Sequence, residues 1–91
     1  MTIEEMAALF EKHDDAYLRS TEDGPRDLAA IIRLQNLAPV NGDVVSASEH
    51  DQFWLAFDEE KVAEAITEED VVYLKQRGLL YEEGMGFSFF A

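Results

Sequence analysis

The segment 53–57 constrains the fold of this chain most, because it combines aromatic residues with the alternation of a β-strand. Its odd-numbered residues are large and apolar, and in an extended chain they share one face. Trp54, the only tryptophan, falls on the other face. Asp58 then offers a helix N-cap directly after the strand. We therefore expect a core strand that leads into a helix.

Trp54 has two interpretations. The one we favour is a core residue, since a strand with large side chains on both faces is typically covered on both sides. In the other, Trp54 lies beside His50 on an open face and anchors a partner protein.

A first helix is predicted at the N-terminus. Thr2 and Glu5 have the spacing of a capping box, and apolar residues follow at helical intervals. We expect this helix to run to Arg19 or Ser20 and the polar residues 20–24 to form a loop.

A second helix is predicted from Pro25, which suits the first helical turn. Pro39 restricts the residue before it, so the helix should end by residue 37 or 38. Apolar side chains occupy much of its circumference, which predicts a helix deep in the core. These side chains are Leu28, Ile31, Ile32, Leu34 and Leu37.

Residues 44–51 fit two structures. Ser46 and Glu49 have the spacing of a capping box, which favours a short helical turn. Alternatively, residues 44–47 form a strand that pairs with 53–57 through a turn. We favour the helical turn.

Two short helices and a hairpin are predicted after the central strand. Asp58 caps the first helix, and the second begins after a capping box at Thr67 and Asp70. Gly78 suits the left-handed residue just past a helix end. Residues 79–82 and 87–90 then read as the strands of a terminal hairpin.

These elements predict one α+β domain over residues 1–91. We expect a small antiparallel sheet of about three strands with helices packed on one face.

The charge balance restricts the partners. Twenty acidic residues face seven basic ones, which gives a formal net charge of −13. Such a surface repels phosphate backbones and anionic membranes, so direct nucleic-acid or membrane binding is not expected. A basic protein partner is expected instead. The chain has no cysteine, signal-peptide pattern or long apolar run, and we expect it to be cytoplasmic.

Carboxylates concentrate between residues 59 and 70. This dense acidic run is either a solvated face or an array that mimics a phosphate backbone before a basic groove. Its members are Glu59, Glu60, Glu64, Glu68, Glu69 and Asp70. With His50 and Trp54, the five glutamates are our candidate partner-binding residues.

No motif predicts catalysis. Glu49-His50-Asp51 and His13-Asp14-Asp15 contain metal-binding residue types, but neighbours in sequence do not converge on one point. The chain also lacks a phosphate-binding loop and a nucleophile elbow. We expect no enzyme activity, no cofactor and no metal.

Three stretches carry a resemblance. Residues 1–6, the segment from Ser46 into Leu55, and the segment from Thr67 to Gly78 resemble small acidic proteins of phage and prophage genomes. The resemblance implies a genomic setting and favours an inhibitor or decoy directed at a host protein. It assigns no catalytic residue.

The leading hypothesis is a non-enzymatic acidic binding protein, such as a phage-encoded inhibitor or nucleic-acid mimic, that contacts a basic host protein. One alternative is a structural or assembly protein, such as a homodimer, that self-associates through the aromatic strand and the C-terminal hairpin. Another is a small metal-dependent enzyme that uses His50 and nearby carboxylates.

Overall fold

The computed structural model describes residues 1–20 and 24–90, so the centre of the predicted 20–24 loop lies outside the described residues. The elements, in chain order, are α1 (Ile3–Lys12), the 3-10 turn η1 (Asp14–Ala16), α2 (Arg26–Leu37), β1 (Val45–Glu49), β2 (Gln52–Leu55), α3 (Glu59–Ala65), α4 (Glu68–Gln76), β3 (Leu80–Glu82) and β4 (Gly86–Phe90).

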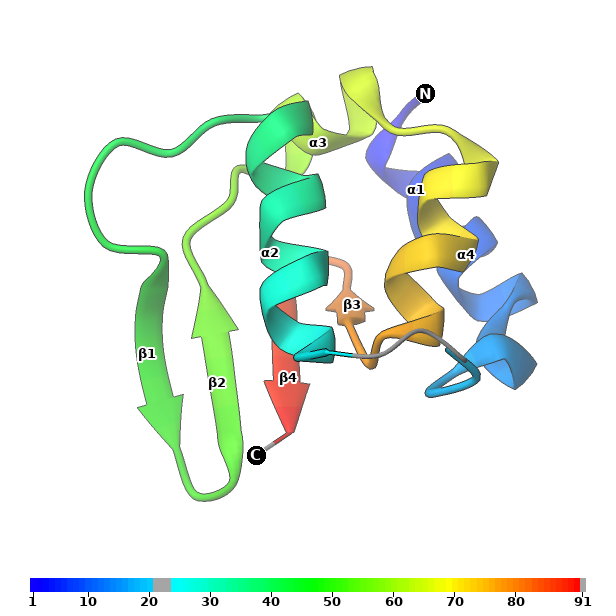
Figure 1. Ribbon diagram of the computed structural model, residues 1–91. Coiled ribbons are helices and arrows are strands. Elements are labelled where there is room, and N and C mark those ends of the chain that lie inside the picture. The colour runs from blue at the N-terminus through cyan, green and yellow to red at the C-terminus, as the bar shows by residue number, and fades with distance from the viewer. Residues whose placement is uncertain (21–23, 91) are drawn as a thin grey trace.

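The strands form one antiparallel sheet in the order β1–β2–β4–β3, and the helices pack on one face of it (Figure 1). This confirms the α+β class. The described residues contain four strands, however, and not about three. The additional strand is β1, where we expected a helical turn, so that prediction is wrong. The cross-strand pairing of Ser48 with Phe53 and of Glu49 with Gln52 outweighs the local helix-start pattern.

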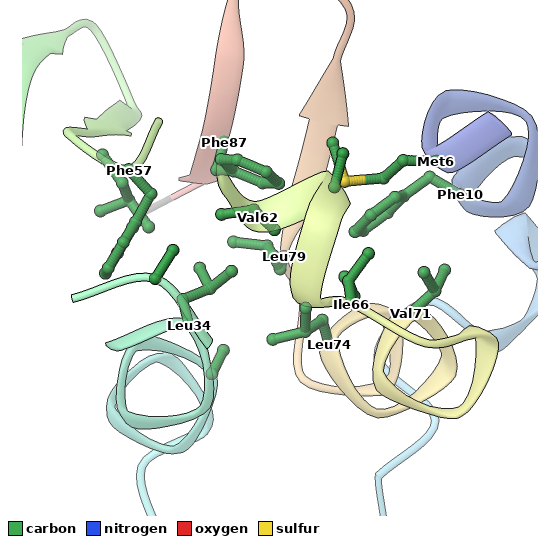
Figure 2. Packing of buried hydrophobic residues seen from close by; sticks show 14 of the residues in the cluster. Met6, Phe10, Leu34, Phe57, Val62, Ile66, Val71, Leu74, Leu79 and Phe87 are labelled. Atoms are coloured by element: carbon green, nitrogen blue, oxygen red, sulfur yellow. The ribbon is translucent and has the colours of Figure 1, made fainter. Parts of the chain in front are cut away.

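One apolar core lies between the helices and the right-hand part of the sheet in Figure 1. Figure 2 shows Phe87 of β4 facing Val62 of α3, with Met6 and Phe10 of α1 at the side. Leu34 of α2 and Leu74 of α4 close the core from below. Each of these side chains is at most 3% exposed, so the α1–α4 helices are held mainly by burial of apolar area.

The predicted helix starts are confirmed. The Thr2 and Thr67 side chains accept hydrogen bonds from the backbone N–H groups of Glu5 and Asp70, and both capping boxes are complete. The Asp58 side chain accepts from two N–H groups in the first turn of α3. These hydroxyl and carboxylate oxygens satisfy donors that have no partner inside a helix.

The first helix is shorter than predicted. It ends at Lys12, and the chain then docks on the end of α4. The Leu18 N–H donates to the Lys75 carbonyl at 3.0 Å, and the Lys75 ammonium donates to Asp14 at 2.9 Å. The Lys75 carbonyl also accepts from the Gly78 N–H, and the Gln76 carbonyl accepts from the Ser20 N–H, so these contacts tie the segment after η1 to the end of α4.

Candidate functional site

The exposed large apolar side chains of the described residues are not scattered. Eight are exposed, and four of them line one groove, namely Leu18, Val45, Phe53 and Phe90. Leu28 and Ile32 are exposed on α2, but they do not line the groove. A contiguous apolar surface on a small protein commonly marks a contact site.

The groove lies between α2 and the part of the sheet made by β1, β2 and β4, and its volume is about 770 Å³. Leu55 and Phe89 also line it. Helix α2 packs on α3 and α4, and in Figure 1 the β1–β2 hairpin extends beyond it at left. Phe53 shares a strand face with the buried Leu55, yet it is 41% exposed.

The two sides of helix α2 differ in burial, contrary to our prediction. Ala30, Leu34 and Ala38 enter the core at a spacing of four residues. Leu28 and Ile32 lie on the opposite side of the helix and are each 53% exposed. The expectation that the whole apolar circumference is buried is therefore wrong. Of the apolar residues on α2, Ile31 lines the groove, whereas Leu28 and Ile32 do not.

Two arginine side chains at or near the groove already have partners within the fold. Arg77 lines it, but this side chain stacks on the Tyr73 ring at 3.4 Å and donates to the Tyr73 carbonyl. Arg33 stacks on the same ring at 3.7 Å and pairs with Asp70. The ring thus contacts two guanidinium groups, which stabilises the wall formed by α4.

Trp54 lies on the face of the sheet that no helix covers. Our favoured interpretation, a core residue covered on both sides, is therefore wrong, since Trp54 is only half-buried. Its neighbours across the sheet are the small residues Ala47 and Ser88. Ser88 itself is buried and accepts a hydrogen bond from the Gln52 amide at 3.0 Å.

His50 occupies the two-residue turn between β1 and β2 and has a positive φ of 56°. Its imidazole is 90% exposed and lies 3.9 Å from the Glu49 carboxylate. It lines a hollow of about 330 Å³ together with Trp54, as the interpretation of an open strand face anticipated.

The candidate glutamates do not share one environment. Glu59 accepts hydrogen bonds from the Tyr81 hydroxyl at 2.6 Å and from the Gly84 N–H at 3.0 Å. Glu60 and Glu64 are exposed on α3 and line a shallow hollow near Glu4. Of the α3 carboxylates, Glu60 and Glu64 are therefore the ones available to a partner.

At the start of α4, two carboxylates have partners within the fold and, in the part of the chain that the structure describes, a third does not. Glu68 accepts from His13 at 2.6 Å and from Lys12 at 2.9 Å, and these two hydrogen bonds lower its pKa. Asp70 is buried and pairs with Arg33 at 2.7 Å. Glu69 is exposed and has no hydrogen bond or ion pair among the described residues.

Within residues 1–20 and 24–90, no group of three or more His, Asp or Glu side chains is placed to hold a metal ion. No helix in this part of the chain is long and apolar enough to cross a membrane. Comparison with protein-family models, with curated proteins and with solved structures finds no match.

Proposed function

We propose that this chain is a non-enzymatic binding protein whose contact surface is the apolar groove between α2 and the β1–β2–β4 sheet. The observation that carries the proposal is the gathering of four of the eight exposed large apolar side chains of the described residues at this groove. Aliphatic and aromatic side chains that converge on one hollow are typical of the centre of a protein interface.

The net charge of −13 supports a basic protein as the partner. Its field attracts a positive surface from a distance, and the groove then supplies short-range apolar contact. Two copies of this chain repel each other by the same field, which favours a different protein as the occupant. The outward carboxylates Glu60, Glu64 and Glu69 would contribute most to this attraction, because they are free of internal ion pairs.

The resemblance to small acidic phage proteins suggests the setting. A phage-encoded inhibitor in the host cytoplasm would occupy the basic surface that a host protein uses for nucleic acid. In this proposal the carboxylates take the place of phosphates and the groove provides affinity that phosphates lack.

A second candidate function is self-association, favoured by one observation. β1 is an edge strand, all five of its residues are exposed, and Glu49 is its single charged residue. Edge strands of this kind pair readily with another chain. Sedimentation over a wide range of protein concentration tests this candidate, and a species that stays monomeric throughout contradicts it.

The main proposal is tested by capture from a lysate of the cells in which the chain is made, followed by calorimetry with the purified partner. The groove variant is Val45→Thr/Phe53→Thr, since both side chains line the groove, both are exposed and threonine suits a strand. The matched control is Ala8→Gln in α1, none of whose residues lines the groove. Sedimentation and thermal melting verify that each variant is folded and monomeric.

We expect the groove variant to weaken binding about tenfold or more and the control to leave it unchanged. Binding should also weaken as salt concentration rises, and Glu60→Lys/Glu64→Lys should increase that loss. Equal affinity of the groove variant and the control for the purified partner would refute the groove. An affinity independent of salt would refute the electrostatic part.

A further inference from the structure

The uncovered face of the sheet places an aromatic ring beside carboxylates. Side chains at 49, 52 and 90 form one row across β1, β2 and β4, and Ala47, Trp54 and Ser88 form the next row. Glu49 and Phe90 are therefore diagonal neighbours of Trp54 on the same face. Asp51 follows in the turn.

These residues surround a hollow of about 330 Å³ that is also lined by Met85. The cross-strand neighbours of Trp54, Ala47 and Ser88, are small, and Trp54 is only half-buried. Within the described part of the chain, the indole N–H has no hydrogen-bond acceptor. Part of Trp54 is exposed to a ligand in the hollow.

The charge in this hollow has one sign. Glu49 and Asp51 are exposed, and the other ionisable side chain that lines the hollow among the described residues is the His50 imidazole, 3.9 Å from the Glu49 carboxylate. No lysine or arginine lines the hollow. An aromatic face bordered by carboxylates attracts a cation through the ring quadrupole and through direct charge pairing.

We propose that this hollow accepts an arginine or lysine side chain of the partner. The inference rests on the proposed function in taking that partner to be basic. Arginine is the better fit, because a planar guanidinium stacks on the indole while its edge donates to a carboxylate. Phe90 lines both this hollow and the apolar groove, so the two sites meet at the end of the sheet.

The single tryptophan makes the site directly observable, since fluorescence of the chain reports on Trp54 alone. The probes are N-acetyl-arginine amide, N-acetyl-lysine amide and, as the uncharged isostere, N-acetyl-citrulline amide. We expect a saturable change with the two cations, a roughly millimolar dissociation constant, and no saturable change with citrulline.

Two charge-matched variants identify the source of the effect. Glu49→Gln/Asp51→Asn removes two charges at the hollow, and Glu11→Gln/Asp15→Asn removes two at exposed residues elsewhere. We expect the first to weaken arginine binding about fivefold or more and the second to change it less than about twofold. Thermal melting checks that both remain folded. Equal weakening by both variants, or an equal response to citrulline, would overturn the cation site.

The titration needs no partner protein, so the cation site can be refuted independently of the proposed function. If Val45→Thr/Phe53→Thr loses partner binding and Trp54 fluorescence of the wild type does not respond to the cations, the groove proposal stands and the cation site is refuted. If Trp54 fluorescence responds to the cations and the partner binds the groove variant as tightly as the wild type, the cation site stands and the groove proposal is refuted.

Discussion

Leu18 lies directly over Gly78, so that a methyl group on residue 78 would come within 2.8 Å of the Leu18 Cδ2 atom. Both residues have positive φ, 58° for Leu18 and 88° for Gly78. The contact joins the segment after η1 to the end of α4 and fixes one wall of the groove. A leucine in a left-handed conformation costs free energy, which the surrounding hydrogen bonds must offset.

Gly78→Ala should lower the free energy of unfolding by about 2–4 kcal/mol, because it adds both backbone strain and a clash. Gly84→Ala is the matched control, since Gly84 also has positive φ but open space around it. That change should cost only about 1 kcal/mol. Urea denaturation measures both. Adding Leu18→Ala to Gly78→Ala should restore part of the loss, and no restoration would contradict the clash.

Asp70→Asn should destabilise the protein by about 1–2 kcal/mol at neutral pH. Burial acts to raise the Asp70 pKa, but hydrogen bonds from the Thr67 backbone and from Arg33 outweigh it and lower the pKa. A lowered folded-state pKa means that the stabilisation is present above the unfolded value, near 3.8, and is lost as pH falls through the lowered one.

The difference between wild type and Asp70→Asn should therefore hold constant from pH 7 to about pH 5 and shrink at more acid pH. Denaturation at a series of pH values measures it. Glu69→Gln is the control, because that side chain is exposed and should have little effect. A difference that grows toward acid pH would show that the Arg33 pairing has been assigned the wrong role.

Tyr81→Phe should cost about 1 kcal/mol of stability, because it removes the hydrogen bond to Glu59 and keeps the ring contacts with Phe10 and Phe87. Burial, and then the bond to Glu59, raise the pKa of Tyr81. Its contribution is therefore complete below the ordinary tyrosine pKa and lost only as pH rises through the raised value.

Phenolate absorbance checks this assignment. Up to about pH 11, wild type and Tyr81→Phe should show the same absorbance increase, since Tyr81 stays protonated in the folded chain. A smaller increase in the variant would mean that Tyr81 ionises with an ordinary pKa.

His50→Gly should stabilise the β1–β2 hairpin by about 1 kcal/mol. His50 holds the position of the turn that has positive φ, where glycine is free of strain. Asp51→Gly is the control and should be neutral or destabilising, because the φ of Asp51 is not positive. Chemical denaturation measures the free energy of unfolding of both variants. A lower value for His50→Gly than for the wild type would contradict backbone strain at His50.

Local signals identified most of the elements. The capping boxes at Thr2 and Thr67 and the cap at Asp58 predicted helix starts correctly, since these hydrogen bonds form within three residues. Gly78 and the terminal hairpin were also predicted correctly. Residues 46–49 were assigned wrongly because their spacing satisfies a helix cap, whereas the contacts that make them a strand come from β2.

The residues of the candidate site were predicted only in part. The sequence indicated an open-face role for Trp54 and His50 only as an alternative, and it placed Leu28 and Ile32 in the core. Exposure depends on which elements lie alongside, and this is set by contacts between residues far apart in the chain, such as Leu18 with Lys75 and Arg33 with Asp70.

The sequence by itself determined the strong negative charge, the helix starts and the alternation that predicted a strand at 53–57, which the structure has at Gln52–Leu55, because each depends on composition or on neighbours a few residues apart. Only the tertiary structure decided that α2 packs on α3 and α4 and that the β1–β2 hairpin extends beyond it. The buried spacing of Ala30, Leu34 and Ala38 turns α2 toward the core along one narrow line. Of the apolar residues outside that line, Ile31 lines the groove that we propose as the binding site.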